Sequence, residues 1–205
     1  MVDNAPRSAK GRRTRVRLFE AGKTVFERDG FLQARISDIS AEAGVSHGSF
    51  YHYFDSKETL FREIAEQVEV RLVGMDDLTL EGEQPPAVER IRAANRAYLR
   101  AYKKEAKIMR VIEEVSRYDA EVQAVRKRRD DHLASRMESS IAKLQKKGLA
   151  DPRVDVRYAA TALGSMVARF AEEMFIRGGD FEINEAVEQL TLLWCNALGI
   201  ASDKG

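Results

Sequence analysis

Apolar residues recur along most of the chain with the 3.6-residue period of helices that bury one face. No run alternates apolar and polar residues for long enough to predict a β-strand. The first helical segment, residues 12–29, carries its apolar stripe on one side and ends before Gly30. The pattern therefore predicts an all-α protein with about nine helices.

Two short helices are predicted next, separated by a tight turn. Ser37 is expected to cap the first helix, and Gly44 to end it in the left-handed conformation. Ser46 would cap the second helix, which places Phe50 and Phe54 on its buried side. Its other side carries polar side chains: His47, Ser49, Tyr51 and His52. This is the helix-turn-helix arrangement that places a helix in the DNA major groove.

The rest of the chain predicts a longer helical region. A helix follows the motif, capped by Asp55 or Ser56, and the acidic, turn-rich residues 74–86 are expected to form a loop. Five more helices are expected, from Pro86 to about Tyr102 and over residues 106–117, 120–147, 154–177 and 185–198. The sequence thus predicts three DNA-binding helices in residues 1–55 and a larger helical domain in residues 56–205.

Charge is distributed unevenly along the chain. The net charge is +1, which gives no overall signal for nucleic acid. Residues 7–17, however, hold six basic side chains and no acidic one. This cluster is either a solvated tail or an arm that meets DNA phosphates, and its position before the motif favours the arm, with Arg12 and Arg13 as contacts.

Other signals narrow the class of protein. The single cysteine, Cys195, rules out an internal disulfide and fits a reducing cytoplasm. No apolar run approaches the ~20 residues that span a bilayer, so neither a membrane anchor nor a signal peptide is expected. The three histidines do not have zinc-ligand spacing, and neither a nucleophile–base pair nor a phosphate-binding loop is present. We therefore expect no metal, no cofactor and no enzymatic activity.

Three stretches carry a resemblance to a known family: LFEAGKTVFERDGF from Leu18, SDISAEAGVSHGSFYHYF from Ser37, and DSKETLF from Asp55. Together they resemble the DNA-binding domain of the tetracycline-repressor (TetR) family of transcription regulators, over about the first third of the chain. In that family Gly22 would usually be alanine. The resemblance implies that three residues lie near the DNA bases: His47, Gly48 and Ser49. It implies that three others meet phosphates: Tyr51, His52 and Lys57. Ser37, at the start of the first motif helix, completes the implied DNA-binding set.

Two further sites are expected in the larger domain. A stripe of methionine and aromatic residues is either plain core or the effector pocket that the resemblance implies: Tyr98, Tyr102, Met109, Ile112, Met137, Met166 and Phe170. Glu113 and Glu114 interrupt an apolar helix, and Glu113 is included as a candidate pocket residue, although both could be exposed. The last two helices are predicted to form a dimer interface, with an intramolecular core as the alternative: Leu163, Val167, Met174, Val187, Leu190 and Trp194.

The sequence therefore predicts a cytoplasmic, homodimeric regulator of the TetR type, acting as a repressor on double-stranded DNA. It would bind a palindromic operator and be released by a small, largely apolar effector. The alternative is an all-α ligand-binding protein or enzyme that retains the helix-turn-helix only as a scaffold.

Overall fold

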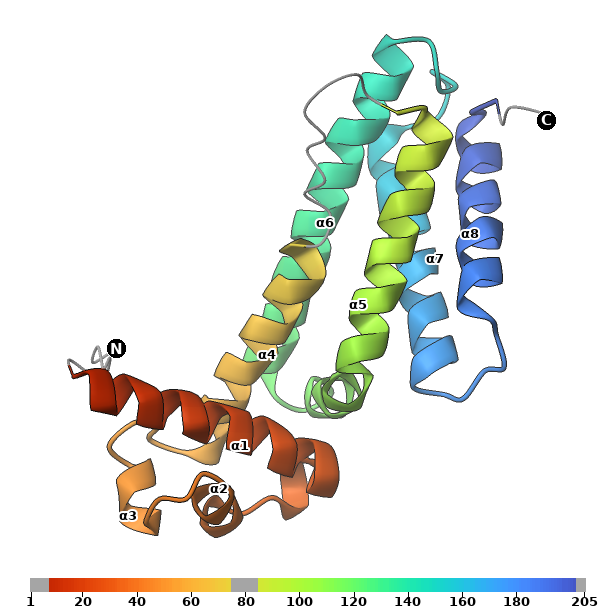
Figure 1. Ribbon diagram of the computed structural model, residues 1–205. Coiled ribbons are helices and arrows are strands. Elements are labelled where there is room, and N and C mark those ends of the chain that lie inside the picture. Colours follow the sequence, from red (N-terminus) through yellow and green to blue (C-terminus); the bar gives the residue numbers. More distant parts are fainter. Residues whose placement is uncertain (1–7, 75–84, 202–205) are drawn as a thin grey trace. The chain divides into compact units, whose positions relative to one another are not determined.

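The computed structural model describes residues 8–74 and 85–201, and in these residues it holds helices and no strand (Figure 1). The all-α prediction is confirmed. The described helices are α1 (Ala9–Gln33), α2 (Ile36–Glu42), α3 (His47–Phe50), α4 (Lys57–Gly74), α5 (Ala87–Val115), α6 (Ala120–Lys146), α7 (Val156–Phe175) and α8 (Ile183–Leu198).

The described part of the chain has eight helices where about nine were predicted, because α5 is continuous. Separate helices were expected up to about Tyr102 and over residues 106–117. The residues between them, Lys103 to Ala106, are all good helix formers without a glycine or proline. The helix therefore runs on to Val115. Most of the predicted loop before it, residues 75–84, lies outside the described residues.

The basic cluster belongs to α1 and is not a separate tail. Ser8 caps the helix by accepting a hydrogen bond from the Gly11 amide at 3.0 Å, so helical structure begins at Ala9 and not at about residue 12. Arg7 lies outside the described residues. At the other end Gly30 adopts φ 74°, which breaks the helix. The phenyl ring of Phe31 then turns back into the core of this region.

α1 and α4 cross closely at Gly22. A Cβ atom at this position would lie 2.6 Å from Leu60 Cδ2 and 3.4 Å from Ile64 Cδ1. Both side chains are fully buried. The absent side chain is thus what allows the two helices to approach, which accounts for a glycine in the middle of α1.

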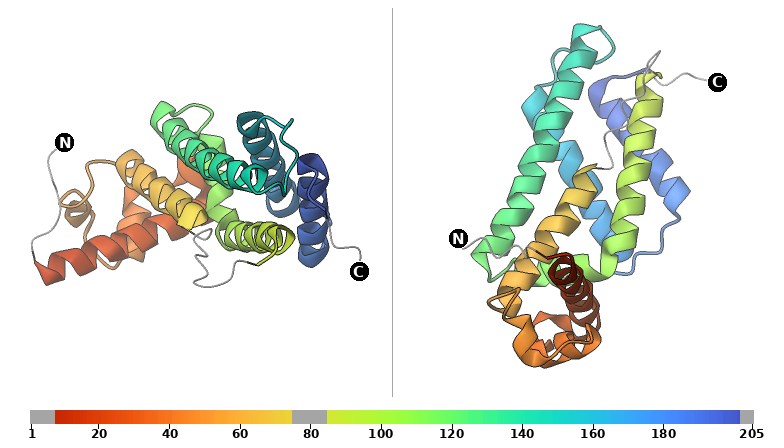
Figure 2. Two further views of the ribbon diagram at one scale, coloured as in Figure 1. Left: turned by 90° about the horizontal axis from the view of Figure 1, so that it is seen from above. Right: turned by 60° about the vertical axis from the view of Figure 1, so that its left-hand side comes forward.

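The chain divides into two compact units that do not follow chain order. The first contains Met1–Glu69 together with Lys107–Arg126, and the second contains Val70–Ala106 and Lys127–Gly205. Each of α4, α5 and α6 therefore contributes residues to both units. Within the second unit, α7 and α8 lie side by side (Figure 2).

Candidate DNA-binding site

α2 begins two residues earlier than the capping prediction implies. Arg35 is the N-cap, with extended backbone angles and no side-chain capping bond, while Ser37 already lies within the first turn. The Ser37 hydroxyl instead lies 3.3 Å from Asp38 Oδ1. The prediction of Ser37 as the cap was therefore wrong, because the chain turns into the helix at Arg35. Asp38 does lie in the first turn, where its negative charge interacts favourably with the positive end of the helix dipole.

The turn between the two motif helices follows the prediction. Gly44 adopts φ 62°, and Ser46 caps α3 by accepting from the Ser49 amide at 3.3 Å. α3 ends at Phe50 and continues as turns to Tyr53, so Phe54, which was expected on the buried side of this helix, lies beyond its end. Phe50 and Phe54 are buried, as the spacing predicted. These two rings anchor the short helix to the core.

The amino end of α3 faces outward. His47 and Gly48 are exposed, and apart from the adjoining chain no heavy atom lies within 4 Å of where a Gly48 Cβ would stand. Ser49 is half-buried, with its hydroxyl 2.8 Å from that of Ser46. The Tyr51 side chain is exposed, with its ring edge-on to the His47 imidazole at a centroid distance of 5.6 Å. His52 is exposed too, so the site presents ring N–H and hydroxyl donors at this surface.

The basic residues of α1 divide into two groups. Arg12 and Arg13 are exposed on the first turns of the helix. Arg15 instead pairs with Glu63 of α4 and lies over the Phe54 ring, 4.8 Å from its centroid. Only part of the cluster therefore points to solvent, while the Arg15 side chain holds α1 to its neighbours in the first unit.

Lys57 lies at the first residue of α4, and its ammonium contacts protein backbone. Nζ donates to the carbonyl oxygens of Phe31 at 2.9 Å, Ala34 at 3.0 Å and Leu32 at 3.4 Å. It also lies 4.8 Å from the centroid of the Phe31 ring. An ammonium has three N–H donors, and these three carbonyls occupy them in this arrangement. A phosphate contact would require one of them to be given up. Ser56, and not Asp55, caps α4 through the Thr59 amide.

An ion pair joins α4 to the start of α6 within the first unit. Arg62 Nη2 lies 2.8 Å from Asp119 Oδ2, and Arg62 Nη1 lies 3.0 Å from Glu121 Oε2. Asp119 Oδ1 also caps α6, accepting from the amides of Glu121 and Val122 at 3.0 Å each. Burial opposes ionisation of this carboxyl, but the Arg62 guanidinium and the two amides outweigh it and hold the pKa of Asp119 below its usual range.

The residues predicted for an effector pocket are distributed over both compact units. Met109, Ile112 and Glu113 lie in the first unit and the other five in the second. In the second unit Tyr98 and Tyr102 are buried, and the Tyr102 ring stacks on Phe175 with centroids 6.3 Å apart. Three are half-buried on α6 and α7: Met137, Met166 and Phe170. Glu113 is half-buried too and pairs with Arg117 at 3.1 Å.

Sequence reasoning missed a buried acid in that stripe. Glu105 lies between Tyr102 and Met109 at helical spacing, and its side chain is 3% exposed. Its Oε1 accepts from Arg71 Nη1 of α4 at 3.2 Å. The spacing alone could have identified this residue, because positions three and four apart share a helix face. Glu105 thus adds a buried carboxylate, paired with Arg71, to a stripe predicted to be apolar.

The residues predicted for a dimer interface are largely covered within one chain. Five of the six are buried: Leu163, Val167, Val187, Leu190 and Trp194. Met174 is half-buried. Little of their surface is left for a second copy, since α7 and α8 already cover one another and the rest of the unit. The exposed apolar side chains of these two helices are instead Tyr158, Leu192 and Leu193.

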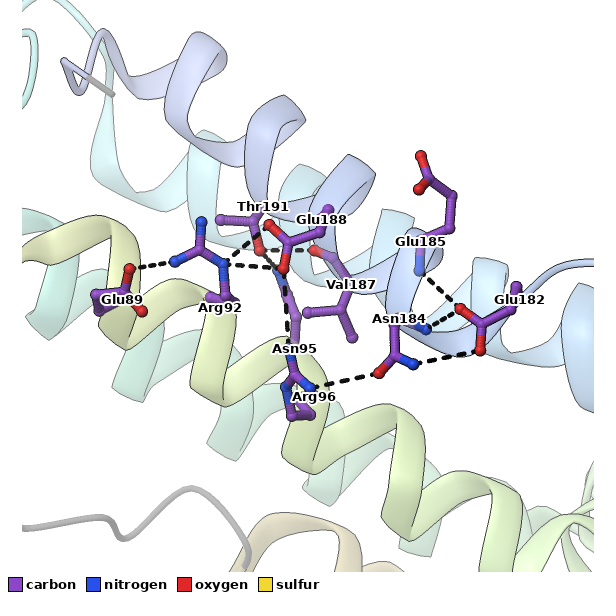
Figure 3. Close-up of polar contacts among 10 residues, drawn as sticks. All are labelled: Glu89, Arg92, Asn95, Arg96, Glu182, Asn184, Glu185, Val187, Glu188 and Thr191. Carbon is purple, nitrogen blue, oxygen red and sulfur yellow. Dashed lines mark hydrogen bonds and ion pairs between the residues drawn. The ribbon is translucent and has the colours of Figure 1, made fainter. Parts of the chain in front are cut away.

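A polar seam, unanticipated from the sequence, joins α8 to α5 in the second unit (Figure 3). Arg92 Nε donates to both carboxylate oxygens of Glu188, at 3.0 and 2.9 Å. Beside this pair, the buried Asn95 amide donates to Thr191 Oγ1 at 3.3 Å, and that hydroxyl donates to the Val187 carbonyl at 2.7 Å. The seam fixes which face of α8 meets α5, so Leu192 and Leu193 remain exposed.

Within 8–74 and 85–201, no group of three or more His, Cys, Asp or Glu side chains could hold a metal ion. None of the helices in this part of the chain has the length and apolar character required to cross a bilayer.

A helix-turn-helix with an exposed α3 and a basic first helix is characteristic of DNA-binding regulators. The sequence model described as bacterial regulatory proteins of the tetR family matches residues 18–64. A second model, described as the tetracyclin repressor-like C-terminal domain, matches residues 84–196, which is more than half of the chain. The protein belongs to the TetR family of transcriptional regulators.

Individual relatives agree over the DNA-binding region. The chain is 47% identical over 49 residues to the HTH-type transcriptional regulator YfiR of Bacillus subtilis, covering 24% of each protein. It is 37% identical over 82 residues to the HTH-type transcriptional repressor DhaR of a Mycobacterium species, covering 39% of this chain and 41% of DhaR. The matched stretch thus spans about a quarter to two-fifths of these relatives.

Solved structures agree in fold over nearly the whole chain. The fatty acid degradation regulator FadR from Bacillus halodurans has a TM-score of 0.74 at 16% identity, covering 93% of this chain and 96% of that one. Salmonella enterica GusR has a TM-score of 0.72 at 20% identity, covering 91% and 95%. At this identity the likeness concerns the fold alone.

Proposed function

We propose that the protein is a homodimeric repressor that binds a palindromic operator and releases it when a small molecule binds the helices after residue 84. The observation that carries the DNA-binding part is the amino end of α3, where His47 and Gly48 are both exposed. In helix-turn-helix proteins this end reaches base edges in the major groove, while the first helix crosses the backbone. Gly48 would let the backbone approach the bases closely.

The DNA part is tested with a mobility-shift experiment on DNA upstream of the protein's own gene. Sequence-specific retardation is expected at moderate salt without added ligand. His47→Ala should weaken the specific complex by about 1–3 kcal/mol. Tyr51→Phe should weaken binding to all sequences about equally, with the salt slope unchanged, if its neutral hydroxyl donates to a phosphate. Absence of specific retardation would refute the proposal and favour the alternative in which the motif serves as scaffold.

A second copy is proposed to bind the outward faces of α7 and α8. Half-sites one DNA turn apart require two recognition helices, and a two-fold dimer supplies them. Tyr158, Leu192 and Leu193 offer exposed apolar surface there. Light scattering after size exclusion should give a dimer, and Leu192→Glu with Leu193→Glu should give a monomer. Leu32→Glu, at an exposed position in the first unit, is the matched control. A monomeric wild-type protein would contradict the proposal.

Release by an effector is proposed to act through the helices shared by both units. Each of α4, α5 and α6 has residues in the DNA-binding unit and in the other. An effector that prefers one arrangement of these helices shifts the population toward it, and a tenfold loss of DNA affinity requires about 1.4 kcal/mol of coupling. Native mass spectrometry of the purified dimer tests whether a small molecule accompanies it. Its addition should then weaken the DNA complex.

A further inference from the structure

Lys57 joins two points of the chain on either side of the helix-turn-helix. The ammonium stands at the start of α4, directly after the motif. The carbonyls that it contacts, those of Phe31, Leu32 and Ala34, come directly before the motif. The Lys57 ammonium therefore joins the segment just before residues 35–56 to the segment just after them.

The carbonyls at this position need such a partner. α1 breaks at Gly30, and the last turn of a helix leaves carbonyl groups without partners inside the helix. No basic residue of α1 lies in its own last turn, where a cation would be favoured by the helix dipole. Lys57 supplies that cation from another helix. The Phe31 ring beneath Nζ also packs against Phe61 of α4, with centroids 4.9 Å apart. Apolar packing between the same two segments therefore accompanies the polar contact.

The first helix of the motif is anchored by its buried side chains Ile39 and Ser40, but not by a side-chain cap at its start. Its N-cap, Arg35, makes no side-chain capping bond. The direction in which the chain enters α2 therefore also depends on the preceding segment, whose last carbonyl, that of Ala34, accepts from Lys57 Nζ at 3.0 Å. α3 follows α2 through the Gly44 turn, so an error at the entry would displace the recognition helix.

We propose that Lys57 is a positioning residue that clamps the two ends of the helix-turn-helix, and not a phosphate contact. Only the expected effect of Lys57 on DNA affinity rests on the proposed function. The clamp itself can be measured without DNA. A lost phosphate contact weakens binding to all sequences and reduces the salt slope by about 0.9 per contact. A lost clamp lowers specific affinity with the slope unchanged, because the phosphate contacts remain while α3 no longer meets the bases in register.

The test uses the full chain with Lys57→Met, which keeps the aliphatic length and removes all three donors. Arg13→Gln is the matched control, since it removes an exposed positive charge of the same unit. Hydrogen–deuterium exchange without DNA should accelerate about tenfold or more over residues 34–39 in Lys57→Met, and not in Arg13→Gln. On DNA, Lys57→Met should lose about tenfold of specific affinity, with unchanged affinity for unrelated sequences.

Unchanged exchange over residues 34–39 in Lys57→Met would overturn the clamp, and so would a salt slope lowered by about one together with equal losses on all sequences. If wild-type protein binds no specific DNA, the proposed function fails, and exchange alone decides the clamp. If Lys57→Met does not fold, Lys57→Gln replaces it. Its shorter amide reaches fewer carbonyls and should give the same pattern to a smaller degree.

Discussion

Gly22 offers a sharp test of the packing in the first unit, because helix propensity and packing predict opposite changes in stability on its replacement by alanine. Replacing it with alanine adds one methyl group to the middle of α1. On propensity alone, the change should stabilise the helix by about 1 kcal/mol. The new Cβ, however, would lie 2.6 Å from Leu60 Cδ2 and 3.2 Å from Leu60 Cγ.

The contact favours a net loss of stability. Because the Cβ would meet both the tip and the branch point of the Leu60 side chain, rotation of one methyl group does not relieve it. Leu60 and its neighbour Ile64 are fully buried and would have to move together. An added methyl group in a packed core costs about 1–3 kcal/mol, and such a contact belongs in the upper half of that range. After the propensity gain, Gly22→Ala should destabilise the unit by about 1–2 kcal/mol.

Hydrogen–deuterium exchange of α1 amides in the full chain measures this locally, since opening of the unit limits their protection. Gly48→Ala is the control, because it also adds a methyl group to a helix but has no atom within 4 Å. In the Gly22→Ala background, Leu60→Ala should cost less than in the wild type, as the clash disappears with the side chain. Protection of α1 that equals or exceeds wild type in Gly22→Ala would refute the close-crossing argument.

Two further predictions concern polar contacts. Asp119 has a lowered pKa, so its ion pair with Arg62 stabilises the protein above the carboxyl's usual pKa of about 3.9 and is lost as the pH falls through the lower folded value. Asp119→Asn, which keeps the α6 cap, should therefore flatten this acid-side loss, and Asp119→Ala should cost about 1 kcal/mol more at neutral pH. A steep acid dependence retained in Asp119→Asn would contradict this assignment. Thr191→Val should cost about 1–3 kcal/mol by leaving the Asn95 amide without its partner, measured by urea unfolding followed through Trp194 fluorescence. Adding Asn95→Leu should restore part of the loss, and additive costs would argue against the pair.

Short-range signals in the sequence predicted most of the secondary structure. The left-handed glycines Gly44 and Gly148 end helices where expected, and Ser46 caps α3. These features depend on a few neighbouring residues and so can be read locally. The merger of two predicted helices into α5 differs because nothing local stops a helix between Tyr102 and Lys107.

Periodicity predicts that a residue is buried but not what covers it. Leu190 and Trp194 lie on an apolar stripe that suited either a dimer interface or an intramolecular core, and neighbouring helices of the same chain bury them. The partners of Lys57 were hidden for the same reason. Its contacts with Phe31 and Ala34 span 26 and 23 residues and depend on tertiary packing. Family resemblance indicated the candidate DNA-binding residues, while the contacts that hold them in place depend on packing between residues far apart in the sequence.

The discontinuous make-up of the first unit has a practical consequence for anyone wishing to isolate the DNA-binding part. A gene fragment ending at Glu69 would omit Lys107–Arg126, and with it the Asp119 partner of Arg62. Apolar side chains that now face that segment would meet water. No single cut of the polypeptide separates the two units, so neither unit can be expressed whole as one continuous fragment without part of the other.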